Sequence, residues 1–298
     1  MKHLLSIESL AQADMEAILA ATVNLKKERG HHGKLPLTGQ TWAMLFSKSS
    51  TRTRVSFEVG IRELGGQVIF LPSSEIQLGR GEPIKDTARV LGRMVHGAVF
   101  RTFAQNDVEE FARYACIPTI NALTDDEHPC QILADIFTFQ EKRGSICGKV
   151  VTFVGDGAGN IATSLIFAAG KAGFELRIAA PKAFQPSAEL VKRAGGKIVL
   201  TEDVQAAAAG ADLLYTDVWV SMGREKESAD RIRQMAGYQV NAAVVKLARP
   251  GVLIMHCLPA YRGKEIDEAT FEANAQTIFD EAENRLHVQK AILSWLVS

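Results

Sequence analysis

The stretch TWAMLFSKSSTRTRVSFEVGIREL, residues 41–64, decides the fold. It begins with the short apolar run TWAMLF and continues through a run of polar residues into a segment with helical periodicity. A strand followed by a helix is the repeating unit of a parallel sheet that carries helices on both faces. The sequence therefore predicts a strand at 41–46 and a helix that begins after it, where Ser49 or Ser50 can serve as the N-cap.

The same alternation of apolar runs and helical segments continues along the chain, and it restarts once near residue 149. The runs that we predict as strands are QVIFLP (67–72), GAVFRTF (97–103), PTINAL (118–123), KVVTFVG (149–155), ELRIAAP (175–181), KIVLTE (197–202), DLLYTDVW (212–219) and VLIMHCLP (252–259). We therefore expect an α/β protein with two doubly wound parallel-sheet domains of similar size.

The expected domains are residues 1–134 and 135–280. A helix from Pro129 to about Arg143 should join them, since the turn GSICGK follows it. A final amphipathic helix, 281–298, is expected to pack back on the first domain.

Composition excludes several classes of protein. With 298 residues, 47% of them hydrophobic, the chain can bury a large core. The 34 Lys and Arg residues balance the 34 Asp and Glu residues, so no overall field favours nucleic acid or an anionic membrane. No apolar run reaches the roughly 18 residues of a membrane span. We expect neither a nucleic-acid partner nor a membrane partner, and any anion site must be local.

Cysteine usage and the N-terminus predict a cytoplasmic protein. The four cysteines show no CxxC spacing and no dense framework, which is typical of reduced thiols. The first 30 residues combine apolar positions at helical spacing with acidic residues, unlike a secretory signal or an Arg-rich transit peptide.

The polar run after the first predicted strand is a candidate phosphate site. A helix that begins there would present hydroxyls and unpaired backbone N–H groups at its positive end. Arg52 could bind a phosphate through two parallel hydrogen bonds. The alternative is a well-capped surface helix with solvated arginines. The position of the polar residues directly after a buried strand favours the anion site.

Four segments carry a resemblance to a known family. FSKSSTRTRVSFE (46–58) closely resembles the carbamoyl phosphate motif of the aspartate and ornithine carbamoyltransferases. The segments FRT (100–102), HPCQ (128–131) and HCLPAYRG (256–263) follow in the order expected of that family. The resemblance covers nearly the whole chain. It implies transfer of the carbamoyl group of carbamoyl phosphate to an amine, without a metal or an organic cofactor.

The resemblance also implies how the donor is held. Arg101, His128 and Thr53 would polarise the carbamoyl oxygen, where charge collects in a tetrahedral intermediate. The residues implied to bind carbamoyl phosphate are Ser50, Thr51, Arg52, Thr53, Gln77, Arg101, His128, Gln131, Cys257, Leu258 and Arg285. Leu258 would offer a carbonyl next to a cis X-Pro bond.

Gln77 belongs to a segment (75–94) that resembles the loop and helix through which one subunit completes its neighbour's site. The resemblance therefore implies a homotrimer, with a higher assembly of trimers left open. Each of these residues has an ordinary alternative. Arg101 or Arg285 could be a surface arginine, His128 or Gln77 a loop residue, and Cys257 a structural thiol.

Three features favour the ornithine branch of the family. DVWVSMG (217–223) resembles the loop that marks ornithine enzymes. The chain reads HCLP where aspartate enzymes read HPLP, and it has no lysine between Lys48 and Lys85, where aspartate enzymes carry a catalytic one. The acceptor implied is L-ornithine, with L-citrulline and phosphate as products, as in arginine biosynthesis.

The residues implied to hold ornithine are Asn160, Asp217, Ser221 and Met222. Asp217 and Cys257 would lie near the attacking amine, so the implied catalytic residues are Arg101, His128, Asp217 and Cys257. A free side-chain amine has a pKa of about 10.4, so these groups must help to position or deprotonate it.

One departure from the family pattern is GDGAGN (155–160), where relatives usually carry two adjacent asparagines and Asn160 matches only the second. Gly155 and Gly157 also fit the first two glycines of a dinucleotide fingerprint. Position 160 is Asn, however, and no ribose-binding acid follows the next strand, so NAD is disfavoured. The rival functions are a putrescine or N-acetylornithine carbamoyltransferase and a catalytically silent regulatory relative.

Overall fold

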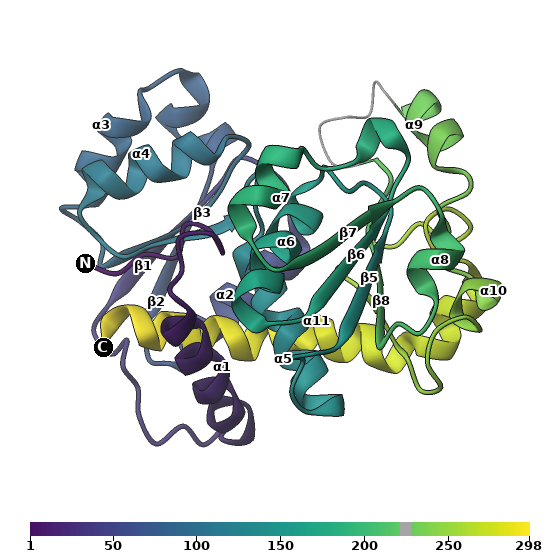
Figure 1. The fold of residues 1–298 in the computed structure, drawn as a ribbon. Coiled ribbons are helices and arrows are strands. Elements are labelled where there is room, and N and C mark those ends of the chain that lie inside the picture. The colour runs from purple at the N-terminus through teal and green to yellow at the C-terminus, as the bar shows by residue number, and fades with distance from the viewer. Residues whose placement is uncertain (221–227) are drawn as a thin grey trace. The chain divides into compact units, whose positions relative to one another are not determined.

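The computed structural model describes residues 1–220 and 228–298 of the chain. It divides into two compact units. Unit 1 consists of Met1–Phe137 and Glu283–Ser298, and unit 2 of Thr138–Ala282. Each unit is built around its own parallel sheet (Figure 1), which confirms the predicted fold class.

Unit 1 contains a four-stranded sheet in the order β2-β1-β3-β4. Its strands are β1 (Thr41–Phe46), β2 (Gln67–Pro72), β3 (Gly97–Arg101) and β4 (Thr119–Leu123). Its helices are α1 (Gln12–Lys27), α2 (Thr51–Glu63), α3 (Ile84–Leu91) and α4 (Gln105–Ala115), with the short 3₁₀ turns η1 (Ser73–Glu75) and η2 (Gln77–Arg80). All four predicted strands of this half are confirmed.

One face of the unit 1 sheet is covered by α3 and α4, which pack against each other (Figure 1). Ala88 of α3 and Phe111 of α4 are buried with Phe100 of β3 in one apolar cluster. Gly97, at the start of β3, has to be glycine, because a Cβ there would lie 2.5 Å from the ring of Trp42. Close strand packing therefore fixes the two strands that end at the candidate anion site.

Unit 2 contains a five-stranded sheet in the order β7-β6-β5-β8-β9. Its strands are β5 (Val150–Val154), β6 (Glu175–Ala179), β7 (Lys197–Thr201), β8 (Leu213–Thr216) and β9 (Leu253–His256). Its shorter helical elements are α6 (Asn160–Ala172), η3 (Lys182–Phe184), α7 (Ala188–Ala194), α8 (Val204–Ala208), α9 (Ser228–Met235) and α10 (Ala242–Val245). The five predicted strands of this half are confirmed as well.

In the core of unit 2, the central strands pack against helices. Val154, Leu214 and Ile254 of β5, β8 and β9 are buried in one apolar cluster with residues of α8 and α10. Most of α6 is buried too, as its largely apolar composition predicts for a helix packed against a sheet. The ends of the central strands are therefore held firmly.

Two long helices contain the boundaries between the units. The helix α5 (Pro129–Arg143) has the predicted limits. The helix α11 runs from Glu268 to Val297, so its predicted start near Glu281 was wrong. The side chain of Asp267 accepts a hydrogen bond from the backbone N–H of Thr270 at 2.6 Å, as an N-cap does. This cap lets the helix begin 13 residues before the expected position.

The strand order places a switch point in each sheet. In unit 1 the chain proceeds from β1 to β2 in one direction and from β3 to β4 in the other, so the switch lies between β1 and β3. In unit 2 it lies between β5 and β8 by the same argument. Ligands of open α/β sheets bind beyond the carboxyl ends of the strands at such points. No helix in the described part of the chain is both long enough and apolar enough to cross a membrane.

Candidate active site

The first candidate half-site begins at the N-terminus of α2, directly beyond the carboxyl end of β1. The predicted cap is confirmed: the backbone N–H of Thr53 donates to the Ser50 hydroxyl at 3.2 Å. The first turn of α2 contains no acidic residue, so no carboxylate of the helix offsets the positive end of its dipole. This terminus is therefore suited to an anion.

Arg285 of α11 connects this terminus to α5 within unit 1. Its guanidinium donates to the Thr53 hydroxyl at 3.1 Å and to the Gln131 side-chain oxygen at 2.5 Å. The Gln131 amide in turn donates to Asp135 at 2.8 Å. Arg285 is 3% exposed and lies inside α11 rather than at its start, so the alternative of a solvated helix-end arginine is wrong.

Arg101 and His128 lie close to Arg285. Arg101 ends β3 as predicted, yet it is only 6% exposed, which excludes a surface arginine. Burial, with the charges of Arg285 and Arg52, lowers the pKa of Arg101 to about 10. The charges of Arg285 and the partly buried Arg52 thus act on the buried guanidinium group of Arg101. A phosphorylated ligand carries the negative charge that a group of arginines binds through paired hydrogen bonds.

His128 is 5% exposed and directly precedes α5. Burial, together with the charges of Arg285 and Arg101, places the pKa of His128 well below its ordinary value. The imidazole is therefore neutral at pH 7. A neutral imidazole that carries a proton on one nitrogen can donate a hydrogen bond to a carbonyl oxygen.

Gln77 and Thr51 differ from these buried groups. Thr51 is the exposed first residue of α2, and Arg52 is partly buried. Gln77 is exposed at the start of η2 and its assignment to a neighbour's site stays a prediction.

Our sequence reasoning gave no role to Lys48, although it precedes the cap. This lysine is 6% exposed, forms an ion pair with Asp125 and lies 4.4 Å from the ring centre of Phe103.

The second candidate half-site, in unit 2, lies at the carboxyl ends of β8 and β9. Asp217 follows β8, and Cys257 follows β9, and these strands pair in parallel register at Thr216 and His256. The Cys257 thiol donates to an Asp217 carboxylate oxygen at 3.0 Å, and the same oxygen accepts from the backbone N–H of Val218 at 2.7 Å. The predicted proximity of Asp217 and Cys257 is thus present in the structure.

Burial raises the pKa of Asp217, and the nearby charge of Glu265 raises it further. A nearby His256, the thiol of Cys257 and the backbone N–H of Val218 oppose this effect without reversing it. A carboxylate with a raised pKa is a better proton acceptor than an ordinary surface aspartate.

His256 and Glu265 support the segment that carries Cys257, and our sequence reasoning missed both. The His256 ring lies 3.1 Å from a Glu265 oxygen, and its other nitrogen accepts from the backbone N–H of Leu258 at 2.9 Å. The Leu258–Pro259 bond is cis, as predicted. A histidine directly before Cys257 in the motif was the available signal.

A metal ion is the other ligand that these side chains could hold. Asp217, His256 and Cys257 place their ligand atoms within 4.8 Å of one another. Both His256 ring nitrogens, however, already engage Glu265 and the backbone of Leu258. A metal ligand needs a free nitrogen lone pair, so this hydrogen bonding favours a structural role for His256.

Asn160 is the first residue of α6, beyond the carboxyl end of β5. The preceding loop is held by Asp156, which accepts from the backbone N–H of Ala158 at 3.1 Å and forms a buried ion pair with Arg231. A Cβ at Gly157 would lie 2.7 Å from Ile178, so close packing explains this glycine without a dinucleotide. The predicted ornithine contacts Ser221 and Met222 lie outside the described residues.

These two half-sites indicate the class of protein to which the chain belongs. A capped helix terminus among buried arginines, on a doubly wound α/β fold, belongs to proteins that bind a phosphorylated small molecule. The family model described as the carbamoyl-P binding domain of aspartate/ornithine carbamoyltransferase matches residues 2–141. The model of the Asp/Orn binding domain matches residues 147–296. The chain therefore belongs to the aspartate/ornithine carbamoyltransferase family and is a carbamoyltransferase.

Relatives narrow the similarity to one branch of this family. The chain is 54% identical to the ornithine carbamoyltransferase of Akkermansia muciniphila, with 99% of this chain and 98% of that protein covered. It is 48% identical to the enzyme of the same name from Methylococcus capsulatus, with 100% and 99% covered.

Solved structures agree with these relatives. The anabolic ornithine carbamoyltransferase of Campylobacter jejuni matches with a TM-score of 0.94 at 41% identity, covering 99% of each chain. The ornithine carbamoyltransferase of Pyrococcus furiosus matches with a TM-score of 0.92 at 42% identity, covering 98% of this chain and 96% of that one. The second family model extends along the C-terminal helix to residue 296, whereas unit 2 of the structure ends at Ala282.

Proposed function

We propose that this chain transfers the carbamoyl group of carbamoyl phosphate to the side-chain amine of L-ornithine, giving L-citrulline and phosphate. The observation that carries the proposal is the convergence of Arg52, Arg101 and Arg285 with a neutral His128 at the capped start of α2. Carbamoyl phosphate has a phosphate group and a carbonyl oxygen, and these match the two kinds of donor at this site. The phosphate neutralises the guanidinium charges, and the carbonyl oxygen accepts from neutral donors.

On the donor side, the phosphate lies against the N-terminus of α2, with Ser50, Thr51, Arg52 and Thr53 as its contacts. Arg101, His128 and Thr53 polarise the carbamoyl oxygen, and Gln131 holds the carbamoyl amide. Arg285 supports this arrangement through its hydrogen bonds to Thr53 and Gln131. Cys257 and the Leu258 carbonyl contribute further contacts, and Gln77 is supplied to a neighbouring subunit.

On the acceptor side, Asn160, Asp217, Ser221 and Met222 bind the amino-acid end of ornithine. The Cys257–Asp217 hydrogen bond and the raised pKa of Asp217 support a site that favours the neutral amine. The amine nitrogen attacks the carbonyl carbon, negative charge collects on the carbonyl oxygen, and the bond from that carbon to the phosphate oxygen then breaks. The leaving phosphate takes the proton lost by the nitrogen, so atoms and charge balance.

The setting that we propose is arginine biosynthesis in the cytoplasm by a homotrimer. The similarity to the anabolic enzyme of Campylobacter jejuni supports the biosynthetic direction. Free cysteines, of which Cys116 and Cys147 are exposed, are consistent with a reducing compartment. The resemblance of residues 75–94 to a subunit-bridging segment supports the trimer, which light scattering of the purified protein would test.

A steady-state assay with four acceptors tests the proposal. Ornithine, putrescine, N-acetylornithine and aspartate are each supplied with carbamoyl phosphate, and carbamoylated product and phosphate are both measured. We expect kcat/KM for ornithine to exceed the others by at least about 10²-fold, because each lost charge contact costs a few kcal/mol. A higher value for another acceptor would change the substrate, and no turnover with any of the four would indicate a silent relative.

A further inference from the structure

Within unit 1, the helices α2 and α11 are joined at two points along their lengths. Near the start of α2, Arg285 donates to the Thr53 hydroxyl at 3.1 Å. At the last residue of α2, Glu63 accepts from the Lys290 ammonium at 2.6 Å. Between these points the helices are in close contact, since a Cβ at Gly60 would lie 3.3 Å from the side chain of Lys290.

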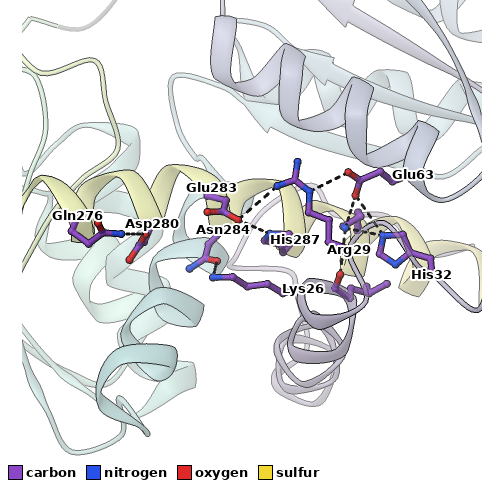
Figure 2. Close-up of polar contacts among 11 residues, drawn as sticks. Lys26, Arg29, His32, Glu63, Gln276, Asp280, Glu283, Asn284 and His287 are labelled. Atoms are coloured by element: carbon purple, nitrogen blue, oxygen red, sulfur yellow. Dashed lines mark hydrogen bonds and ion pairs between the residues drawn. The ribbon is translucent and has the colours of Figure 1, made fainter.

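Lys290 is an unusual residue for this place because its side chain is 0% exposed. Its ammonium donates to Glu63, to a His32 ring nitrogen at 3.0 Å and to the Leu25 carbonyl at 3.3 Å. Three N–H groups thus have three acceptors. Figure 2 shows Glu63 and His32 turned toward each other beside α11, with Arg29 on the other side of Glu63.

The charges of this cluster depend on one another. Burial lowers the pKa of Lys290, and Glu63 opposes that effect only in part. Burial alone would raise the pKa of Glu63, yet its contacts with Lys290, His32 and Arg29 bring that pKa below its ordinary value. A buried ion pair of this kind adds little net stability, because desolvation offsets the attraction. It does restrict geometry, since any displacement leaves a buried charge without its partner.

The contact of Lys290 with Glu63 also restricts the position of Arg285, because both Arg285 and Lys290 lie on α11. Arg285 and Lys290 are five residues apart on one helix, about 7.5 Å along its axis. A slide or rotation of α11 on α2 would therefore move both side chains together. A displacement of about 1 Å in a catalytic contact can cost on the order of 10²-fold in rate. The hydrogen bonds from Arg285 to Thr53 and Gln131, at 3.1 and 2.5 Å, leave little tolerance for such a shift.

We propose that Lys290 is a positioning residue for the donor site: its contact with Glu63 sets the register of α11 on α2 and so places Arg285 against Thr53. This inference rests on the proposed function, because Arg285 acts in catalysis only if carbamoyl phosphate is the donor. Lys290 itself touches no substrate.

The test compares Lys290→Met with the parent enzyme. Methionine keeps much of the side-chain volume and removes the three hydrogen bonds. We expect KM for carbamoyl phosphate and Kd for inorganic phosphate, the latter from calorimetry, to rise about 10-fold, the loss of a charge-assisted contact. KM for ornithine should stay within about twofold, because Arg285 does not contact that substrate in our assignment. All assays are run well below the unfolding midpoint of each variant.

Two substitutions of Glu63 separate position from charge. Glu63→Gln keeps an oxygen that accepts from Lys290, and we expect it to stay within about threefold of the parent for both phosphate readouts. Glu63→Ala removes the acceptor and should behave like Lys290→Met. If Lys290 matters only for stability, all three variants would shift the unfolding midpoint and none would shift the binding of phosphate, which would overturn the proposal.

Asp280→Asn is the matched control. Asp280 also lies on α11, and within unit 2 it accepts from Lys142 at 2.5 Å with a side chain 24% exposed, close to the 21% of Glu63. We expect no change in KM for carbamoyl phosphate. An equal rise with Asp280→Asn, or an unchanged Kd for phosphate with Lys290→Met, would overturn the role of Lys290. A parent enzyme that binds phosphate but carbamoylates no ornithine would instead refute the proposed function.

Discussion

The two candidate half-sites solve opposite electrostatic problems. In unit 1, side chains from β3, α2, α5 and α11 gather at a helix terminus, where Arg285 donates to Thr53 and Gln131 and its charge acts on Arg101. In unit 2, a carboxylate and a thiol at the ends of two adjacent strands share one hydrogen bond. The first lies at the switch point of its sheet, between β1 and β3, and the second lies beside the switch point of its sheet, beyond the ends of β8 and β9. Topology therefore explains their places but not their difference.

The difference follows from the chemistry of the proposed substrates. Carbamoyl phosphate brings negative charge, and a preorganised set of cations stabilises it without reorganisation at the moment of reaction. Ornithine brings a protonated amine that must lose its proton before it can attack. A carboxylate whose pKa is raised by burial meets this need better than an ordinary one. Removing a charge from each half-site should therefore have different consequences.

Arg101→Met should produce the largest effect. The substitution keeps the buried volume at the end of β3 and removes the guanidinium that we assign to the developing oxyanion. We expect kcat to fall about 10²- to 10³-fold, the cost of losing one such donor. Stopped-time assays of citrulline formation would measure it. Arg62→Met, on the exposed side of α2, is the control, and an equal loss there would contradict a specific role for Arg101.

Asp217→Asn should lower kcat/KM for ornithine by about 10²-fold, through the loss of a positioned proton acceptor. Stability should respond in the opposite direction. Because burial raises the pKa of Asp217, its stabilising contribution is fully present below its unfolded pKa and is lost as pH rises through the folded value. At pH 7, above the unfolded pKa, Asp217 therefore disfavours folding, whereas a neutral amide has no such cost.

Thermal unfolding at pH 7 tests the predicted stability of Asp217→Asn. We expect the unfolding midpoint of the variant to be equal to or above that of the parent. Binding of inorganic phosphate should be unchanged, since Asp217 has no assigned donor contact. A lower midpoint together with weaker phosphate binding would show that Asp217 serves the fold rather than the acceptor.

Local patterns predicted most of the fold. The nine strands, the Ser50 cap and the limits of α5 depend on apolar runs and capping residues close together in the chain. The start of α11 was missed because we relied on apolar periodicity and overlooked the cap at Asp267.

Long-range contacts were beyond the sequence. A lysine such as Lys290 is normally exposed, and its burial depends on acceptors distant in the chain, among them Glu63, 227 positions away. The contact of Arg285 with Thr53 spans 232 positions, and the family resemblance, which implied only that each residue binds the donor, did not predict it. The partner of His256 was missed for a different reason: Glu265 is close in sequence, but nothing in the pattern marks it as buried.

Glu175→Gln should produce the smallest effect, and it separates charges that support the fold from charges that bind substrates. Glu175 begins β6, at the end of the unit 2 sheet opposite to Asp217. It accepts from Arg177 at 2.6 Å and pairs with Lys197 across the strands. Because one partner is exposed, we expect the free energy of unfolding to fall by only about 1 kcal/mol. The values of kcat and both KM should not change.

The pH dependence of this loss tests its cause. Hydrogen bonds from Lys197 and Arg177 lower the pKa of Glu175, so its stabilising contribution is present above the ordinary glutamate pKa of 4.5 and is lost as pH falls through the lower folded value. Urea unfolding at pH 7, 5 and 3 should therefore show a difference between parent and variant that shrinks toward pH 3. A difference that stayed constant would mean that the amide side chain of the variant packs poorly and that the charge of Glu175 contributes nothing. Lys197→Met, which removes the exposed partner, should lose less than Glu175→Gln, because Arg177 still holds the carboxylate.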